Sequence, residues 1–277
     1  MRIIKSIGQL ICLSCIVIAC SNQPNYGNLE NSNLSGVDSS SISSDTSTFS
    51  LPHIFNSVDT NKIVKILKTG TYHNDEVWAN AENGIWFGLF QNKAGFVIEK
   101  IEISAELVHD VIVDGDESIK TGWQISTKNV NTNLLLMQGI ELKEGLLKHV
   151  HIPNANLLPG DSLVFEYGST SYKLFATGTS IFDYEISESP FVENYGLFLT
   201  GVKNGQEITQ LLVEHQSFDD AMVSILFIGD IDGDGFPDLI LDNAQHYNVT
   251  NPTLYLSKGV SKNKMLQIVG WHWSVGC

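Results

Sequence analysis

Four carboxylates alternate along one short segment in a spacing that could hold a metal ion. Residues 229–241 read Gly-Asp-Ile-Asp-Gly-Asp-Gly-Phe-Pro-Asp-Leu-Ile-Leu, so acidic side chains occupy loop positions 1, 3, 5 and 9, at Asp230, Asp232, Asp234 and Asp238. Calcium is a hard cation that takes about six to eight oxygen ligands, and the backbone carbonyl at position 7 of such a loop, here that of Phe236, supplies one of them. We therefore expect a Ca2+ site formed by these five residues.

The sequence around this loop excludes an EF-hand. An EF-hand requires Glu at position 12 and a helix on each side. Here position 12 is Leu241, and the flanking runs Val223–Ile228 and Asp238–Leu241 have the apolar, partly β-branched composition of strands. Gly235 permits the sharp bend. Because carboxylates crowded in one loop would repel one another without a cation, we expect the ion to be part of the fold.

The Asp-x-Asp-x-Asp-Gly-x-x-Asp spacing between two strands resembles the calcium loop of FG-GAP and VCBS repeats, the blades of integrin-α-type β-propellers. The resemblance covers roughly residues 224–258, where Asn251–Ser257 stands at the place of the next strand. It implies a calcium-binding unit built of strands. The chain has a single such loop, and no Phe-Gly…Gly-Ala-Pro segment precedes it, so a full propeller is not expected. The alternative is a solvated acidic turn that binds no ion.

Short apolar runs separated by Gly, Asn, Asp and Pro fill the chain from Leu51 to Cys277 and have the spacing of β-strands. Helical periodicity is scarce, and its best example is residues 61–68. We expect an all-β body with sandwich-like or partial-propeller sheets, one calcium loop between two strands, and a possible division near residues 153–159. The expected strands are 84–90, 96–104, 122–127, 133–140, 146–152, 162–167, 172–177, 195–201, 208–215, 223–228, 238–241, 253–256 and 266–271.

Two heptapeptides of the body echo each other. Tyr172–Gly178 reads YKLFATG and Tyr195–Gly201 reads YGLFLTG. They predict two equivalent strands of one sheet. The segment Lys203-Asn204-Gly205 has the composition of a tight hairpin turn.

Residues 1–19 have the layout of a secretory signal. Two basic residues precede an apolar run from Ile7 to Ala19, which is too short to cross a bilayer comfortably as a helix of about 20 apolar residues. Residues 17–20, Val-Ile-Ala-Cys, resemble the bacterial lipobox. This resemblance implies a lipoprotein whose Cys20 is lipidated, and Ser21 after it favours the outer membrane. The alternative is that Cys20 merely lies near an ordinary cleavage site.

Residues 20–50 are rich in Ser and Asn and have few large apolar side chains, so they cannot bury enough surface to fold. We expect a flexible tether with a reach of about 30 Å, followed by a folded body at 51–277. Among the four cysteines, two lie in the signal and Cys20 would carry lipid, which leaves Cys277 and no intrachain disulfide. The predicted location is the bacterial cell envelope, on the outer membrane, facing the periplasm or the cell surface.

The chain is strongly acidic. It holds 31 acidic and 16 basic residues, a formal charge of −15, and without residues 1–19 the charge becomes 14 − 31 = −17. Its one arginine, Arg2, lies in the signal. Because phosphate recognition depends on basic patches and on the guanidinium fork, this composition argues against nucleic acid or an anionic membrane surface as a partner. Cations are the favoured small partners.

Three other motifs are weaker candidates for chemistry. Gly160–Leu163 spells the Gly-Asp-Ser-Leu block of GDSL esterases, but the strand expected after it and the absence of their partner motifs argue for a turn that enters a strand. His149 and His151 alternate on one expected strand and could bind a metal, although no third ligand is evident. The acidic cluster Asp110–Glu117 does not repeat the calcium spacing, so we expect a charged hairpin tip.

Aromatic residues near the carboxyl end of the chain could line a ligand pocket. His246 and Tyr247 follow the calcium loop closely. Trp271 and Trp273 flank His272 on one expected strand face, where they could stack on a sugar or pack in the core. We therefore regard His246, Tyr247, Trp271 and Trp273 as candidate pocket residues.

Two functions are compatible with the sequence. The first is an exported, lipid-anchored, calcium-stabilised β-rich module that binds a glycan or protein ligand, or acts as a scaffold, without catalysis and without catalytic residues. The second is a hydrolase or lyase acting on carbohydrate, with Asp219, Asp220 or Glu214 as its carboxylates. A cavity with two inward carboxylates about 5–10 Å apart would favour the enzyme.

Overall fold

The computed structural model of the chain describes residues 63–182 and 190–276. In these residues the fold is all-β, as predicted, and every pair of named strands is antiparallel. The described part contains one short 3-10 turn, η3 (Asn74–Glu76), and no helix of a length and hydropathy that would cross a membrane. The predictions for the signal, for the lipidated Cys20, for the tether and for Cys277 lie outside the described residues.

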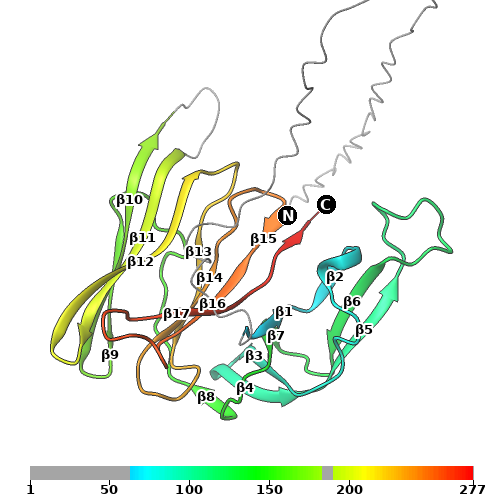
Figure 1. The fold of residues 1–277 in the computed structure, drawn as a ribbon, viewed down its shortest axis with the longest axis horizontal. Coiled ribbons are helices and arrows are strands. Elements are labelled where there is room, and N and C mark those ends of the chain that lie inside the picture. The colour runs from blue at the N-terminus through cyan, green and yellow to red at the C-terminus, as the bar shows by residue number, and fades with distance from the viewer. Residues whose placement is uncertain (1–62, 183–189, 277) are drawn as a thin grey trace, which may run out of the picture. The chain divides into compact units, whose positions relative to one another are not determined.

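The first half of the described chain forms two sheets (Figure 1). The N-terminal sheet has the strand order β1-β7-β3-β4-β8, and the side sheet has the order β2-β6-β5. Their strands are β1 (Lys65–Leu67), β2 (Gly70–Tyr72), β3 (Trp86–Asn92), β4 (Gly95–Ile101), β5 (Ile103–Val108), β6 (Gly122–Thr127), β7 (Thr132–Gln138) and β8 (Gly145–Leu147).

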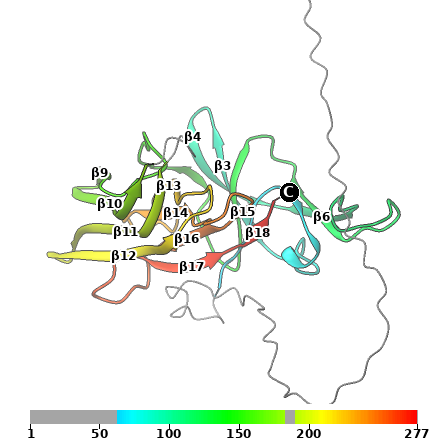
Figure 2. The same ribbon diagram turned by 90° about the horizontal axis from the view of Figure 1, so that it is seen from above.

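The second half forms two four-stranded sheets and one short pair of strands, which can be followed in Figures 1 and 2. The hairpin sheet has the order β12-β11-β10-β9, the central sheet has the order β13-β14-β16-β17, and β15 pairs with β18. Their strands are β9 (Ser162–Tyr167), β10 (Thr170–Ile181), β11 (Phe191–Lys203), β12 (Gln206–Ser217), β13 (Ser224–Gly229), β14 (Asp238–Asp242), β15 (Val249–Thr250), β16 (Pro252–Leu256), β17 (Gln267–Trp271) and β18 (Ser274–Val275).

The central sheet is buried on both faces. Leu239 and Leu241 of β14 lie in a hydrophobic cluster with Leu197 of the hairpin sheet. Ile240, between them, lies in a second cluster with Phe87 of the N-terminal sheet. Because successive side chains of a strand point to opposite faces, the central sheet is packed between the other two. This burial explains why β14 and β16 read as continuous apolar runs in the sequence.

A third cluster joins the N-terminal sheet to the side sheet, with Trp86 and Phe90 packed against Ile103 and Ile125. All described strands belong to one compact unit. In the segment 153–159, Leu157 is buried in the cluster that the hairpin and central sheets share.

The prediction of a helix at residues 61–68 is wrong for residues 63–68, the part of this segment that the structure describes. Lys65–Leu67 form β1, which pairs with β7 in a register that places Leu67 opposite Leu136. Ile66 and Leu67 are both buried, and they belong to two different hydrophobic clusters. A strand can bury consecutive side chains between two layers, whereas an amphipathic helix buries one stripe. Packing therefore outweighs the weak helical pattern.

The hairpin sheet agrees with the predictions from its sequence. The two echoing heptapeptides lie on β10 and β11, which are neighbouring strands with Lys173 opposite Thr200. Asn204 and Gly205 at the next turn have φ angles of 55° and 76°, as a type I′ hairpin requires. The tight turn predicted at this point is confirmed.

The strand expected at 146–152 is shorter in the structure. Strand β8 ends at Leu147, and His149 then makes a single antiparallel bridge with Gly229. A Cβ atom at Gly229 would lie 2.5 Å from the backbone oxygen of Lys148. Only glycine therefore admits this close approach beside the acidic loop.

Candidate metal centre

The acidic loop joins β13 to β14, two adjacent strands of the central sheet. The last residue pair of the β13–β14 ladder before the loop is Gly229 and Asp238. Both residues are buried, so the loop begins and ends in the interior of the protein. Gly233 and Gly235 have φ angles of 77° and 89°, which are favourable only for glycine or a few polar residues. The bend expected at Gly235 is present.

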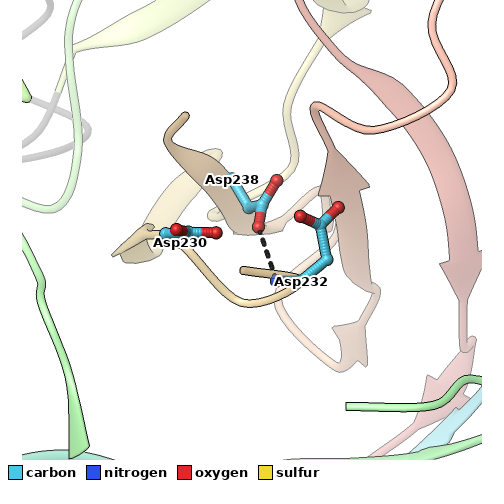
Figure 3. A group of neighbouring side chains, drawn as sticks. All are labelled: Asp230, Asp232 and Asp238. Atoms are coloured by element: carbon cyan, nitrogen blue, oxygen red, sulfur yellow. Dashed lines mark hydrogen bonds between the residues drawn. The ribbon is translucent and has the colours of Figure 1, made fainter. Parts of the chain in front are cut away.

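Three of the four predicted carboxylates converge in this loop. Ligand oxygens of Asp230, Asp232 and Asp238 all lie within 4.8 Å of one another. Figure 3 shows these side chains grouped around one space between the loop and the start of β14. This is the one such group of three metal-ligating side chains in residues 63–182 and 190–276.

Asp238 is the most deeply placed of the three, with 0% of its surface exposed. Its Oδ2 accepts hydrogen bonds from the backbone N–H groups of Ile231 at 2.7 Å and Asp232 at 3.2 Å, and its Oδ1 accepts one from Ser257 at 2.8 Å. Burial, followed by repulsion from Asp232, raises the pKa of Asp238 to about 8 even though these bonds favour the charged form. A nearby cation would favour the ionised carboxylate.

Asp230 organises the turn. Its Oδ1 accepts hydrogen bonds from the N–H groups of Gly233 at 2.7 Å and Asp234 at 3.1 Å, and its Oδ2 accepts one from Gly235 at 2.9 Å. The backbone N–H of Asp230 donates to the hydroxyl of Tyr167 on β9 at 3.2 Å. The hairpin sheet therefore supports the first residue of the loop.

One oxygen of Asp232 lacks a protein partner. Oδ2 of Asp232 is buried and accepts no hydrogen bond from the described residues, while Oδ1 accepts one from the N–H of Asp234 at 3.2 Å. Burial, then the charge of Asp234, raises the pKa of Asp232, and Lys258 acts in the opposite direction. An unpaired buried oxygen is costly. A cation at this point would satisfy it.

Asp234 and Phe236 are placed differently from the group of three. Asp234 is not a member of that group, and its Oδ1 accepts hydrogen bonds from the N–H of Phe236 at 2.9 Å and from the hydroxyl of Ser257 at 2.8 Å. The ring of Phe236 lies 5.7 Å from the ammonium group of Lys203, at the turn of β11 and β12. The roles of Asp234 and of the Phe236 carbonyl as ligands stay predictions.

Sequence reasoning missed three residues that support the loop, namely Tyr167, Lys203 and Ser257. Ser257 belongs to the segment that was expected as the next strand, but nothing in its spacing indicated two bonds to the loop. Tyr167 and Lys203 come from the hairpin sheet, and only the packing of the two sheets brings them near. Their residue types carry no metal-binding signal.

The donors present fit a hard cation. All three side chains that converge are carboxylates, which suit Ca2+ or Mg2+, whereas zinc sites use imidazole and thiolate more often. The site combines a buried unpartnered oxygen with negative charge on a fixed backbone. This arrangement can hold an ion and thereby stabilise the loop.

The other motifs have structural partners in the described residues. The ring of His149 meets Phe96 edge-on at 5.0 Å, and the strand that would align His149 with His151 is absent. Ser162 begins β9 after a turn in which the N–H of Asp161 donates to Leu158 at 2.8 Å. The GDSL-like segment is thus a turn that enters a strand, as expected.

The acidic cluster 110–117 lies in the connection of β5 and β6. Its carboxylates bind their own loop: Asp110 accepts a hydrogen bond from the N–H of Ile112 at 3.0 Å, and Asp114 accepts one from Thr121 at 3.0 Å. The hydrogen bond from His73, at 2.5 Å, holds the pKa of Asp110 below its ordinary value. These contacts organise a hairpin loop, as expected.

The four candidate pocket residues do not all lie at one cavity. His246 and Trp273 line one cavity of about 510 Å3, which Tyr247 and Trp271 do not line. Tyr247 is 68% exposed, and Trp271 packs against the cluster shared by the hairpin and central sheets. Strand β17 ends at Trp271, so the expected strand face of Trp271 to Trp273 does not form; His272 instead lies 2.7 Å from the backbone oxygen of Glu76.

The carboxylates of the enzyme hypothesis do not share one cavity. Asp219 lines the cavity of His246 and Trp273. Asp220 lines a different cavity, with Met222, and Glu214 is exposed on β12 opposite Gly196. These three residues therefore do not form the pair of inward-facing carboxylates that the enzyme hypothesis requires.

Comparison of the chain with family models, with curated proteins and with solved structures finds no match.

Proposed function

We propose that this protein is an exported, lipid-anchored binding or scaffolding module whose β-rich body is stabilised by one calcium ion and carries no catalytic site. The calcium loop is similar to that of FG-GAP and VCBS repeats in its residue spacing. The signal-like residues 1–19 and the lipobox-like residues 17–20 support anchoring through Cys20 on the bacterial outer membrane.

The observation that carries the calcium proposal is the buried, unpartnered Oδ2 of Asp232 beside the carboxylates of Asp230 and Asp238. Carboxylates that are close together and partly buried repel one another and are poorly solvated, so their ionised forms are unfavourable unless a cation is present. The described residues place the ammonium of Lys258 close enough to act on Asp232, but a single lysine does not balance three carboxylates. A divalent cation balances them more completely.

The position of the loop favours a stabilising role for the ion. The loop bonds to Ser257 after β16 and to Tyr167 of β9. An ion held by the loop therefore strengthens contacts between the central sheet and the hairpin sheet. Binding to the folded state alone at 100 times the dissociation constant contributes about 2.7 kcal/mol.

Thermal unfolding of the full chain, purified in detergent, tests this role. We expect excess chelator to lower the melting temperature by about 5–10 °C, and added calcium to restore it. Asp232→Ala removes this response, whereas Asp116→Ala, which changes an exposed carboxylate of the β5–β6 connection, retains it. An unchanged transition of the wild-type protein in excess chelator contradicts the calcium proposal.

The anchor is tested separately. Expression in a bacterial host fed a labelled fatty acid is expected to label the wild-type chain but not Cys20→Ser. Cys277→Ser is the matched control and retains the label. A label that persists in Cys20→Ser contradicts anchoring at that residue.

A further inference from the structure

A second site lies at the junction of three segments that follow strands of the hairpin and central sheets. The cavity of about 510 Å3 is lined by residues 217–219, Gln245, His246, Asn248, Val249 and Trp273. The backbone N–H of Asp219 donates to the oxygen of Gln245 at 2.8 Å, and that of Gly276 donates to Asn248 at 2.5 Å. The cavity is therefore built on paired backbone, and its volume is typical of small-molecule sites, about 300–1,000 Å3.

Two aromatic side chains line this cavity, Trp273 and Phe218. The ring of Phe218 is held by edge contacts with Tyr195, at 5.3 Å between centroids, and with His215, at 5.2 Å. Indole and phenyl faces accept the C–H groups of a flat, weakly polar ligand surface. The aromatic lining indicates a ligand with one apolar face.

The polar lining is fixed around the same cavity. Nε2 of His246 lies 2.8 Å from Oδ2 of Asp219, and Nδ1 accepts a hydrogen bond from the N–H of Asn248 at 3.4 Å. These two contacts assign the proton to Nε2 and hold the carboxylate in place. The side-chain amide of Asn248 makes no hydrogen bond with the residues that the structure describes, so it can donate to and accept from a ligand.

We infer that this cavity binds a neutral carbohydrate, with a pyranose face against Trp273 and hydroxyl groups bonded to Asp219 and Asn248. A carboxylate and an amide match the donor and acceptor pairs of adjacent hydroxyls. The charge of Asp219, with Asp220 next in the chain, disfavours anionic ligands. Both ring nitrogens of His246 already have hydrogen-bond partners, Asp219 and the N–H of Asn248. Asp219 is the one carboxylate among the described residues that line the cavity, so the site is suited to binding a glycan rather than to cleaving it.

This inference supplies a ligand class for the proposed binding module, and it uses none of the residues of the calcium loop. Its test is a glycan array of neutral and anionic saccharides probed with the full calcium-loaded chain, followed by calorimetric titration with the neutral saccharide that binds best. We expect the wild-type chain to bind neutral glycans. Trp273→Ala is expected to lower the affinity about tenfold and Asn248→Ala about threefold.

The matched control is Tyr247→Ala, in the same segment but outside the cavity lining, which retains the wild-type affinity. Since Trp273→Ala could disturb the fold, the melting temperature of each variant is compared with that of the wild type. Asn248→Ala tests the cavity independently at a half-buried side chain. The inference is overturned when no neutral glycan binds, when only anionic glycans bind, or when Asn248→Ala and Trp273→Ala both bind like the wild type. The calcium proposal is tested independently of glycan binding: it fails if chelator does not change the melting temperature of the wild-type chain.

Discussion

The carboxylate of Asp238 accepts a hydrogen bond from the backbone N–H of Ser257 at 2.8 Å, across 19 residues of chain. The hydroxyl of the same serine donates to Asp234 at 2.8 Å. Ser257 follows β16, the strand next to β14 in the central sheet. One residue therefore couples the middle and the end of the acidic loop to the neighbouring strand, and the loop is part of the sheet rather than an appendage on it.

Ser257→Ala is expected to weaken this coupling without removing it. The substitution deletes the bond to Asp234 and keeps the backbone bond to Asp238, so we expect a loss of about 0.5–1.5 kcal/mol in the free energy of unfolding and weaker calcium binding. Denaturant unfolding with and without calcium measures both. Ser261→Ala is the control, because among the described residues its exposed hydroxyl bonds only to nearby Asn263, at 2.8 Å. Equal stability of the two variants would count against the coupling.

The spacing of the four aspartates was enough to predict where carboxylates meet, because alternate side chains of a tight loop turn toward one centre. The apolar composition of the segments on either side was enough to predict that the loop joins two strands. The spacing could not predict that Asp234 would turn toward Ser257, because that contact depends on the pairing of β14 with β16. It could not predict the support from Tyr167, which depends on how two sheets pack.

The errors in the fold have the same physical origin. Residues 63–68 contain apolar side chains that fit either a helix or a strand, and pairing with β7 decides between them. The strand expected through Ile152 ends early because His149 bridges to Gly229 of another sheet. Trp271 and Trp273 were expected on one face, but the chain leaves β17 after Trp271. In each case long-range packing overrides a local pattern.

Gly201→Ala tests the close packing of the hairpin sheet. A Cβ at this position would lie 2.6 Å from the ring of Tyr172 and 3.0 Å from Met265. The buried ring cannot move freely, so we expect a destabilisation of about 1–3 kcal/mol from overpacking, measured by denaturant unfolding. Gly115→Ala is the control, since a Cβ there meets nothing within 4 Å. A wild-type stability of Gly201→Ala would contradict the packing described.

Acid is expected to destabilise the fold through two histidines, His215, which is buried, and His272, which is half-buried. Burial is the largest cause of a lowered pKa for His215 and for His272. Below the ordinary histidine value of about 6.5, the unfolded chain therefore binds protons that the folded chain does not, and stability falls as the pH falls from there toward the folded values. The melting temperature in calcium-saturated buffer should drop between pH 7 and pH 5.

His215→Gln separates this effect from general acid denaturation. The glutamine can still donate to the backbone oxygen of Asn243, which lies 3.1 Å from Nε2 of His215, but it does not titrate. We expect a smaller drop in melting temperature for His215→Gln than for the wild type. The exposed His151→Gln serves as the control. A drop of the wild-type size in His215→Gln would show that this histidine does not contribute.

Calorimetric titration of the metal-free full chain with calcium is the decisive test of the metal site. We expect one ion bound per chain, an affinity lowered by about 10–100-fold or more in Asp232→Ala, and an unchanged affinity in Asp116→Ala. Absence of calcium binding by the wild-type chain, or equal affinity of Asp232→Ala and the wild type, would contradict it.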